Sequence, residues 1–192
     1  TFPPRRRAVV AGHEGDLDAA TGLLDHAEAA TRASALGALA RLGALTPAHL
    51  HQALSDSSPV VRRRAAALAV LHPGVSLLGL LVDDDDSVVE QAAWACGERE
   101  PPEAGVVEAL AGVVRSHADP LCREAAVAAL GAIGDDAGLA AVLAGTEDRA
   151  TVRRRAVIAL APFSGPEVDA ALARAAGDRD WQVRQAAEDQ LR

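Results

Sequence analysis

The chain has 192 residues, of which 49% are hydrophobic and only 2% aromatic, and its formal net charge at pH 7 is −8. This balance of apolar and charged residues excludes an intrinsically disordered chain, and the length suits one ordinary domain. The acidic charge argues against non-specific nucleic-acid binding, because neutralising phosphates requires a basic surface. Alanine is abundant, and since alanine favours helices and disfavours strands, the composition predicts an all-α protein.

A short motif recurs along the chain: an apolar or small residue, usually an Arg, and an Ala three positions further on. Six copies begin at Thr31, Val61, Val88, Cys122, Val152 and Val183. The apolar residues that follow have the spacing of one helix face. Pro or Gly usually comes next, and then a second amphipathic stretch that ends in an acidic turn. Pro and Gly are the expected start and stop signals of helices, so each unit is predicted to be a helix–turn–helix hairpin.

Hairpins of this size are too small to bury their own apolar faces, so they are expected to stack on one another. We expect a single repeat domain over residues 1–192, with repeats that open near positions 5, 31, 61, 88, 122, 152 and 183. The predicted fold is an all-α, right-handed α-solenoid of about six hairpins. The small alanines should let neighbouring helices approach closely.

Three segments, 56–70, 118–134 and 178–191, carry a resemblance to a known family. Each has an acidic turn, an apolar residue followed by Arg, two spacer positions and an Ala-rich helix. This pattern resembles the HEAT-like repeats first described in phycobilisome lyases, and the resemblance covers nearly the whole chain. It implies the solenoid architecture and leaves the activity open, because this repeat serves many unrelated functions.

Charged residues recur with the motif in a pattern that predicts a ladder. Acids upstream of each helix should accept hydrogen bonds from its free N–H groups, where the helix dipole favours negative charge. Each Arg should pair with an acid in its own or a neighbouring turn, because its planar fork suits a carboxylate. The alternative is an Arg stripe that grips phosphates. The predicted ladder consists of Arg32, Arg62, Arg123, Arg153 and Arg184 with Asp56, Asp119, Asp148 and Asp178.

Three Arg triplets, at 5–7, 62–64 and 153–155, exceed what the ladder requires. Their extra guanidinium groups are expected to be solvated. The alternative is that they reach an anionic partner, either a protein or a nucleic acid.

The motif copy at Val88 departs from the pattern, because Val89 stands where Arg is expected. Four consecutive carboxylates, at 83–86, precede it. They could attract a cation or a basic peptide, but the calcium-loop signature is absent. The run is therefore predicted to be a solvated turn that caps the next helix.

An apolar patch is predicted just before this acidic run. Val75, Leu78 and Val82 have the spacing of one helix face, where other repeats carry polar or small residues. An apolar patch on a solenoid surface is a natural docking site. The alternative is that the short 27-residue spacing of repeats here rotates the helix and buries both its faces. The candidate partner-binding residues are Val75, Leu78, Val82, Asp83, Asp84, Asp85 and Asp86.

The histidine and cysteine spacings indicate no metal site, and no residue points to a cofactor. The pair His13-Glu14 resembles one of the His-Glu pairs with which HEAT-repeat deoxyhypusine hydroxylases hold two irons. That family needs several such pairs, and this chain has one. Cys96 and Cys122 are expected to be small, buried core residues.

The expected function is a non-catalytic scaffold that binds a protein or peptide on its solenoid surface. The alternative is an enzyme or enzyme subunit that resembles phycobilin lyases or alkylpurine DNA glycosylases, which also use such repeats. The few aromatic residues and the acidic charge disfavour the glycosylase. No run of 18 apolar residues occurs, so we expect no membrane span and a cytoplasmic protein. The sequence specifies neither the partner nor the oligomeric state.

Overall fold

The computed structural model describes residues 2–192. This part of the chain contains twelve α-helices, three short 3-10 helices and no strand, which confirms the all-α prediction. Thr1, where the expected 1–192 domain begins, lies outside the described residues. The chain divides into two compact units, and the boundary falls between Leu80 and Leu81. Within residues 2–192, no helix combines the length and the apolar character needed to span a membrane.

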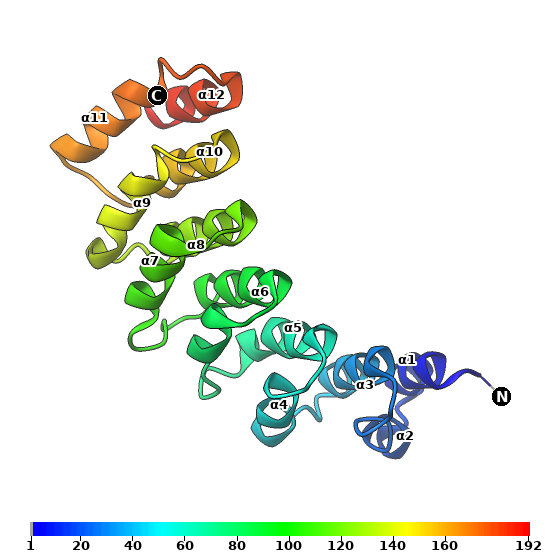
Figure 1. Cartoon of the computed structure of the whole chain (residues 1–192). Helices are drawn as coiled ribbons and strands as arrows, with labels where there is room; N and C mark the ends of the chain where they lie inside the picture. Colours follow the sequence, from blue (N-terminus) through cyan, green and yellow to red (C-terminus); the bar gives the residue numbers. More distant parts are fainter. Residues whose placement is uncertain (1) are drawn as a thin grey trace. The chain divides into compact units, whose positions relative to one another are not determined.

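The first unit has two layers of helices (Figure 1). In one layer the central helix packs against both of its neighbours, and the three are α1 (Pro4–Glu14), α3 (Ala29–Arg41) and α5 (Pro59–Leu68). The other layer contains α2 (Leu17–Thr21) and α4 (Pro47–Leu54). A short 3-10 helix, η1 (Ala69–Leu71), continues from the end of α5.

The second unit repeats this arrangement. Its first layer places each helix beside the next, in the order α6 (Asp86–Gly97), α8 (Pro120–Ile133), α10 (Ala150–Ala159) and α12 (Trp181–Gln190). Its second layer contains α7 (Val106–Ser116), the 3-10 helix η3 (Asp136–Gly138), α9 (Leu139–Gly145) and α11 (Pro166–Ala175). Sequential helix pairs stacked in this way confirm the predicted α-solenoid.

The helix ends carry the signals that the sequence indicated. Proline occupies the first turn of several helices, such as Pro47 in α4 and Pro120 in α8. A backbone N–H at this position would have no acceptor within the helix, so proline, which lacks the N–H, costs no hydrogen bond there. The Asp119 side chain caps α8 by accepting the N–H of Leu121. At the other end of α8, Gly134 adopts a φ of 66°, a left-handed conformation that favours glycine.

Small residues set the helix spacing in the second unit. A Cβ placed on Gly131 of α8 would lie 2.7 Å from the Ala159 Cα of α10, and one placed on Gly97 of α6 would lie 2.8 Å from the Ala129 Cα of α8. Real Cβ atoms do not approach backbone so closely. These glycines therefore allow one helix to touch the backbone of the next, as the alanine-rich composition predicted.

The segment before α6 differs from the expected α-helix. Leu78–Val82 forms a 3-10 helix, η2, and the residues just before it form a turn. Val75 is fully buried whereas Val82 is 82% exposed, so the prediction that Val75, Leu78 and Val82 share one helix face is wrong. Pro73 and Gly74 favour a turn, and this turn leaves Val75 outside the 3-10 helix.

The glycine contacts lead to a first prediction. Gly131→Ala should lower the free energy of unfolding by about 1–3 kcal/mol, because α8 and α10 must move apart. Gly112→Ala in α7 is the control, since a Cβ there meets nothing within 4 Å. That change should raise stability by about 0.5–1 kcal/mol through reduced chain entropy. Urea unfolding followed by circular dichroism measures both, and equal effects of the two substitutions would contradict the close-contact interpretation.

Candidate functional site

One arginine in three of the repeats joins two successive turns of its unit. The Arg123 guanidinium donates from Nε and Nη2 to the two carboxylate oxygens of Asp148, at 2.6 and 2.8 Å. Its Nη1 donates to the backbone oxygens of His117 and Ala118, at 2.7 and 2.9 Å. A single side chain thus bonds to the turn before its own helix and to the turn 25 residues further on.

The same bidentate pair occurs between Arg32 and Asp56 and between Arg153 and Asp178. These side chains are largely buried, with exposed fractions of 9–16%. The hydrogen bond from Arg lowers the pKa of Asp56, Asp148 and Asp178 below the ordinary carboxyl value, and amide donors in each turn add to the effect.

Two further ladder arginines also bond to carbonyl oxygens of the turn before their own helix. Arg62 donates to the backbone oxygen of Asp56 at 2.9 Å, and Arg184 donates to that of Asp178 at 2.7 Å. Asp119 acts as the cap of α8. The acid therefore comes from the neighbouring turn, while the arginine's own turn supplies carbonyl oxygens.

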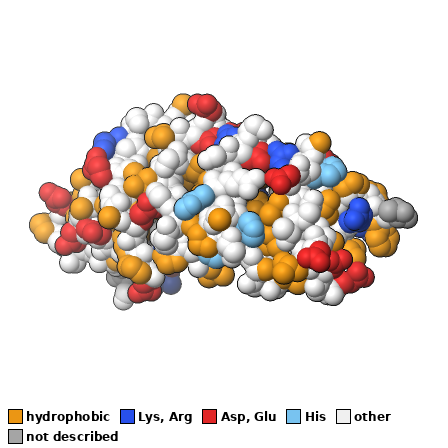
Figure 2. Space-filling view, turned by 90° about the horizontal axis from the view of Figure 1, so that it is seen from below, with side chains coloured by type: hydrophobic (Ala, Val, Ile, Leu, Met, Phe, Trp, Pro, Cys, Tyr) orange, Lys and Arg blue, Asp and Glu red, His pale blue; other side chains and the backbone are white. Residues whose placement is uncertain are grey.

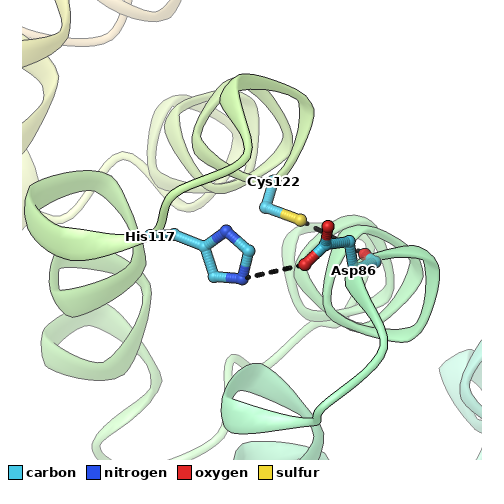
Figure 3. Close-up of side chains that lie close together, drawn as sticks. All are labelled: Asp86, His117 and Cys122. Atoms are coloured by element: carbon cyan, nitrogen blue, oxygen red, sulfur yellow. Dashed lines mark hydrogen bonds and ion pairs between the residues drawn. The ribbon is translucent and has the colours of Figure 1, made fainter.

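Three polar side chains from two successive repeats lie together near the first turns of α6 and α8 (Figure 3). Asp86 Oδ1 lies 3.8 Å from His117 Nε2, and the Cys122 thiol donates to the Asp86 backbone oxygen at 3.2 Å. One ligand atom from each of the three residues lies within 4.8 Å of the others, which is close enough for the three to share a metal ion.

The hydrogen bonds of His117 give this cluster a structural role instead. His117 Nδ1 accepts the Asp119 N–H at 3.2 Å, so the neutral ring carries its proton on Nε2 and has no lone pair there for a metal. Cys122 is buried, and desolvation is the largest cause that raises its pKa to about 12, which keeps it a thiol. The Nε2–H faces Asp86 Oδ1, 3.8 Å from Nε2.

A shallow groove lies on the α1–α3–α5 layer of the first unit, with a volume of about 260 Å³. We call it the arginine groove. Its floor consists of small residues of α3, and no acidic residue lines it. Its lining residues are Arg5, Val9, Ala30, Ala33, Ser34, Gly37, Arg41, Val60 and Arg64.

Two of the three arginines rest against glycines of the preceding helix. A Cβ on Gly12 would lie 2.9 Å from Arg41 Nη1, and a Cβ on Gly37 would lie 2.5 Å from Arg64 Nη2. The glycines therefore leave the space that holds these guanidinium groups against the helix surface. Among the described residues, neither Arg41 nor Arg64 forms an ion pair.

The corresponding arginine of the second unit has an acid partner. Arg155 occupies the same motif position in α10 as Arg64 in α5, and its Nη2 lies 3.5 Å from Glu124 Oε1. Glu124 stands 31 residues before Arg155. The residue at this distance before Arg64 is Ala33, on the floor of the groove. An alanine in place of this glutamate leaves the cation of Arg64 directed at the groove.

The predicted docking residues do not form one surface. Val75 is buried, and the acidic run forms the predicted capping turn, in which Asp83 accepts the Asp85 N–H and Asp85 accepts the Ser87 N–H. A partner contact at the exposed Val82 remains a prediction.

Sequence reasoning did not single out the groove as such. Two of its arginines, Arg5 and Arg64, belong to the triplets for which an anionic partner was the alternative, but Arg41, Ala33 and Gly37 carried no signal by themselves. A comparison of residues 31 positions apart would have shown the exchange of Glu for Ala.

Charge is mixed on the face drawn in Figure 2. Acidic patches occur at several places, with small basic groups between them rather than a continuous basic stripe. On this face the distribution agrees with the net charge of −8.

Comparison with known proteins supports the repeat architecture. Residues 75–161 match the profile of HEAT repeats, which confirms the HEAT-like resemblance of the sequence. No curated protein matches the chain.

Several solved structures share the fold. YibA of Escherichia coli superposes with a TM-score of 0.68 at 17% identity, covering 100% of this chain and 75% of YibA. Human deoxyhypusine hydroxylase gives 0.52 at 19% identity, with 98% and 77% covered. A computationally designed armadillo repeat protein for modular peptide recognition gives 0.52 at 18% identity, with 98% and 90% covered. At these identities the likeness establishes the fold and not the activity.

The ladder leads to a prediction about pH. Asp148→Asn should lower stability at neutral pH by about 1–2 kcal/mol, because it removes a charge-assisted hydrogen-bond pair that is partly exposed to solvent. The folded pKa of Asp148 lies below the ordinary value, so its contribution is present above about pH 4 and is lost as pH falls through the folded pKa.

The stability difference between the wild type and Asp148→Asn should therefore shrink below about pH 4 in urea titrations. The exposed Asp84 provides the control, since Asp84→Asn should change stability little at any pH. A difference that stays constant down to the most acid pH would rule out the Arg123–Asp148 pair as its source.

Proposed function

We propose that this chain is a non-catalytic binding module that holds an acidic segment of another protein in the arginine groove. The observation that carries the proposal concerns Arg64. Its counterpart in the second unit, Arg155, pairs with Glu124, whereas the residue at the corresponding position before Arg64 is Ala33. A guanidinium held in place without an acid is available for a carboxylate from outside.

The lining of the groove supports a protein segment as the ligand. Val9 is 42% exposed and Val60 is 54% exposed, so the arginines are flanked by apolar side chains that a peptide can cover. Peptide binding commonly combines a few apolar anchors with charges that set orientation and association rate. The groove has only three arginines in its lining, which suits a short acidic segment better than a long phosphate backbone that requires an extended basic surface.

The fold supports this role. A computationally designed armadillo repeat protein of similar fold was made for modular peptide recognition, so stacked helical repeats are a fold that peptide binding can use. Both cysteines are free and buried, as suits a reducing compartment, and we place the protein in the cytoplasm.

The experiment uses a fluorescein-labelled octaglutamate peptide and the full chain. Fluorescence anisotropy should show saturable binding that weakens as salt is added, since the contacts are charged and partly exposed. Arg64→Ala and Arg41→Ala should each weaken binding roughly fivefold to tenfold, corresponding to about 1–1.4 kcal/mol. Arg155→Ala is the matched control and should leave the affinity unchanged, because Arg155 already forms an ion pair with Glu124.

Two outcomes would overturn the proposal. One is the absence of octaglutamate binding to a folded chain at low salt. The other is equal loss of affinity in Arg155→Ala and Arg64→Ala, which would indicate general attraction to a polyanion. A labelled single-stranded oligonucleotide of equal charge should bind more weakly than octaglutamate, and stronger binding would also contradict a protein ligand.

A further inference from the structure

We propose that the second unit has a site on α6 where Glu90 and Trp94 bind an arginine side chain of a partner protein. This site is separate from the arginine groove and goes beyond the proposed function. It follows from the packing of α6, α8 and α10 and from the exposed indole of Trp94.

The contact of α6 with α8 has the same register as the contact of α8 with α10. A Cβ on Gly97 of α6 would lie 2.8 Å from the Ala129 Cα of α8. A Cβ on Gly131 of α8 would lie 2.7 Å from the Ala159 Cα of α10. Each glycine is the tenth residue of its motif copy, and each alanine is the eighth residue of the next copy. The same motif positions therefore meet in both contacts.

This register gives Glu90 a counterpart whose partner is known. Glu124 is the third residue of its motif copy and Arg155 is the fourth residue of the next copy, and their Oε1 and Nη2 atoms lie 3.5 Å apart. In the α6–α8 contact the third residue is Glu90 and the fourth is Ala125. This contact therefore has the acid of the pair and a methyl group in place of its arginine.

The carboxylate of Glu90 is accessible to a cation from outside. Glu90 is exposed, and in the part of the chain that the structure describes it takes part in no ion pair. Burial is the largest cause that raises the pKa of Cys122, and the charges of Asp119, Asp86 and Glu90 raise it further. Glu90 therefore adds to a negative potential near the first turn of α8, which favours a cation.

The indole of Trp94 lies one helical turn after Glu90. Glu90, Trp94 and Glu98 follow one another at intervals of four residues, and residues four apart are neighbours on one face of a helix. The Glu98 N–H donates to the Trp94 backbone oxygen at 3.2 Å, so the helical turn extends to Glu98. Trp94 is 47% exposed, and the residue at its motif position in α8 is Ala128. A cation beside Glu90 can therefore also contact the face of an indole.

Arginine suits this pair of groups better than lysine does. The edge of a guanidinium pairs with a carboxylate while its planar face stacks on an aromatic ring. An ammonium group is compact and more strongly hydrated, so it gains less from the indole. The equivalent Arg155 side chain is 41% exposed, so an arginine bound at Glu90 should also remain near the surface and be weakened by salt.

The test uses the full chain with Trp181→Phe, which leaves Trp94 as its single tryptophan. Trp181 is 65% exposed, so this change should leave the fold intact. Titration with a capped tetra-arginine peptide should change the fluorescence of Trp94 to saturation. A tetra-lysine peptide of equal charge should bind at least about threefold more weakly.

Two pairs of variants in this background locate the site. Glu90→Gln should weaken tetra-arginine binding roughly fivefold. Glu124→Gln removes the same charge at the same motif position and should change the affinity little, because Glu124 is already paired with Arg155. Ala125→Arg should pair with Glu90 and abolish the fluorescence response, whereas Ala140→Arg adds the same charge at an exposed position of α9 and should preserve it. Circular dichroism confirms that each variant is folded.

Four results would overturn the proposal. They are the absence of tetra-arginine binding at low salt, binding detected by calorimetry without a change in Trp94 fluorescence, equal affinity for tetra-lysine, and equal weakening by Glu90→Gln and Glu124→Gln. The last would indicate general attraction of the peptide to an acidic chain. Arg64→Ala should leave tetra-arginine binding unchanged, so this test is independent of the arginine groove.

Discussion

A guanidinium that bonds to the carbonyls of one turn and the carboxylate of the next is the interaction on which this structure depends. The helices are short and alanine-rich, and short helices gain most of their stability from packing. The turns between them expose backbone carbonyls, which Arg32, Arg123 and Arg153 satisfy. Since each arginine also holds the acid of the following turn, it fixes the distance between repeats.

The same residue type acquires a second use when the acid is missing. Arg155 of α10 forms an ion pair with Glu124 of α8, whereas Arg64, at the same motif position, has Ala33 where that glutamate would stand. One substitution between repeats therefore separates an arginine that stabilises the fold from an arginine that is free to bind. The repeat at Val88 differs at another motif position, because Val89 replaces the ladder arginine there.

Much of the fold could be predicted from the sequence because its signals are local. Proline, glycine and aspartate mark the helix ends, and the motif period of about 30 residues predicts stacking. The acid partners of Arg123 and Arg153 follow from this period, because they lie 25 residues downstream. The apolar spacing of residues 75–82 led to a wrong prediction. These residues have the period of an α-helix, but they lie between Pro73-Gly74 and an acidic turn and form no α-helix.

The candidate site was harder to predict because it is defined by differences between repeats. Ala33 and Gly37 look like ordinary helix residues until Ala33 is aligned with Glu124 and Gly37 is found beneath Arg64. The cluster of Asp86, His117 and Cys122 joins residues up to 36 positions apart, and its meaning depends on which nitrogen of His117 accepts a hydrogen bond. Neither fact is contained in a motif.

The most direct test of this account gives Arg64 the acid that its repeat lacks. In Ala33→Glu the new carboxylate should pair with Arg64, raise the urea midpoint slightly and abolish the binding of octaglutamate. Ala132→Glu adds the same charge at an exposed position of α8 and should bind octaglutamate as the wild type does. If Ala33→Glu binds octaglutamate as tightly as Ala132→Glu, the unpaired arginine is not the binding group and the central claim is wrong.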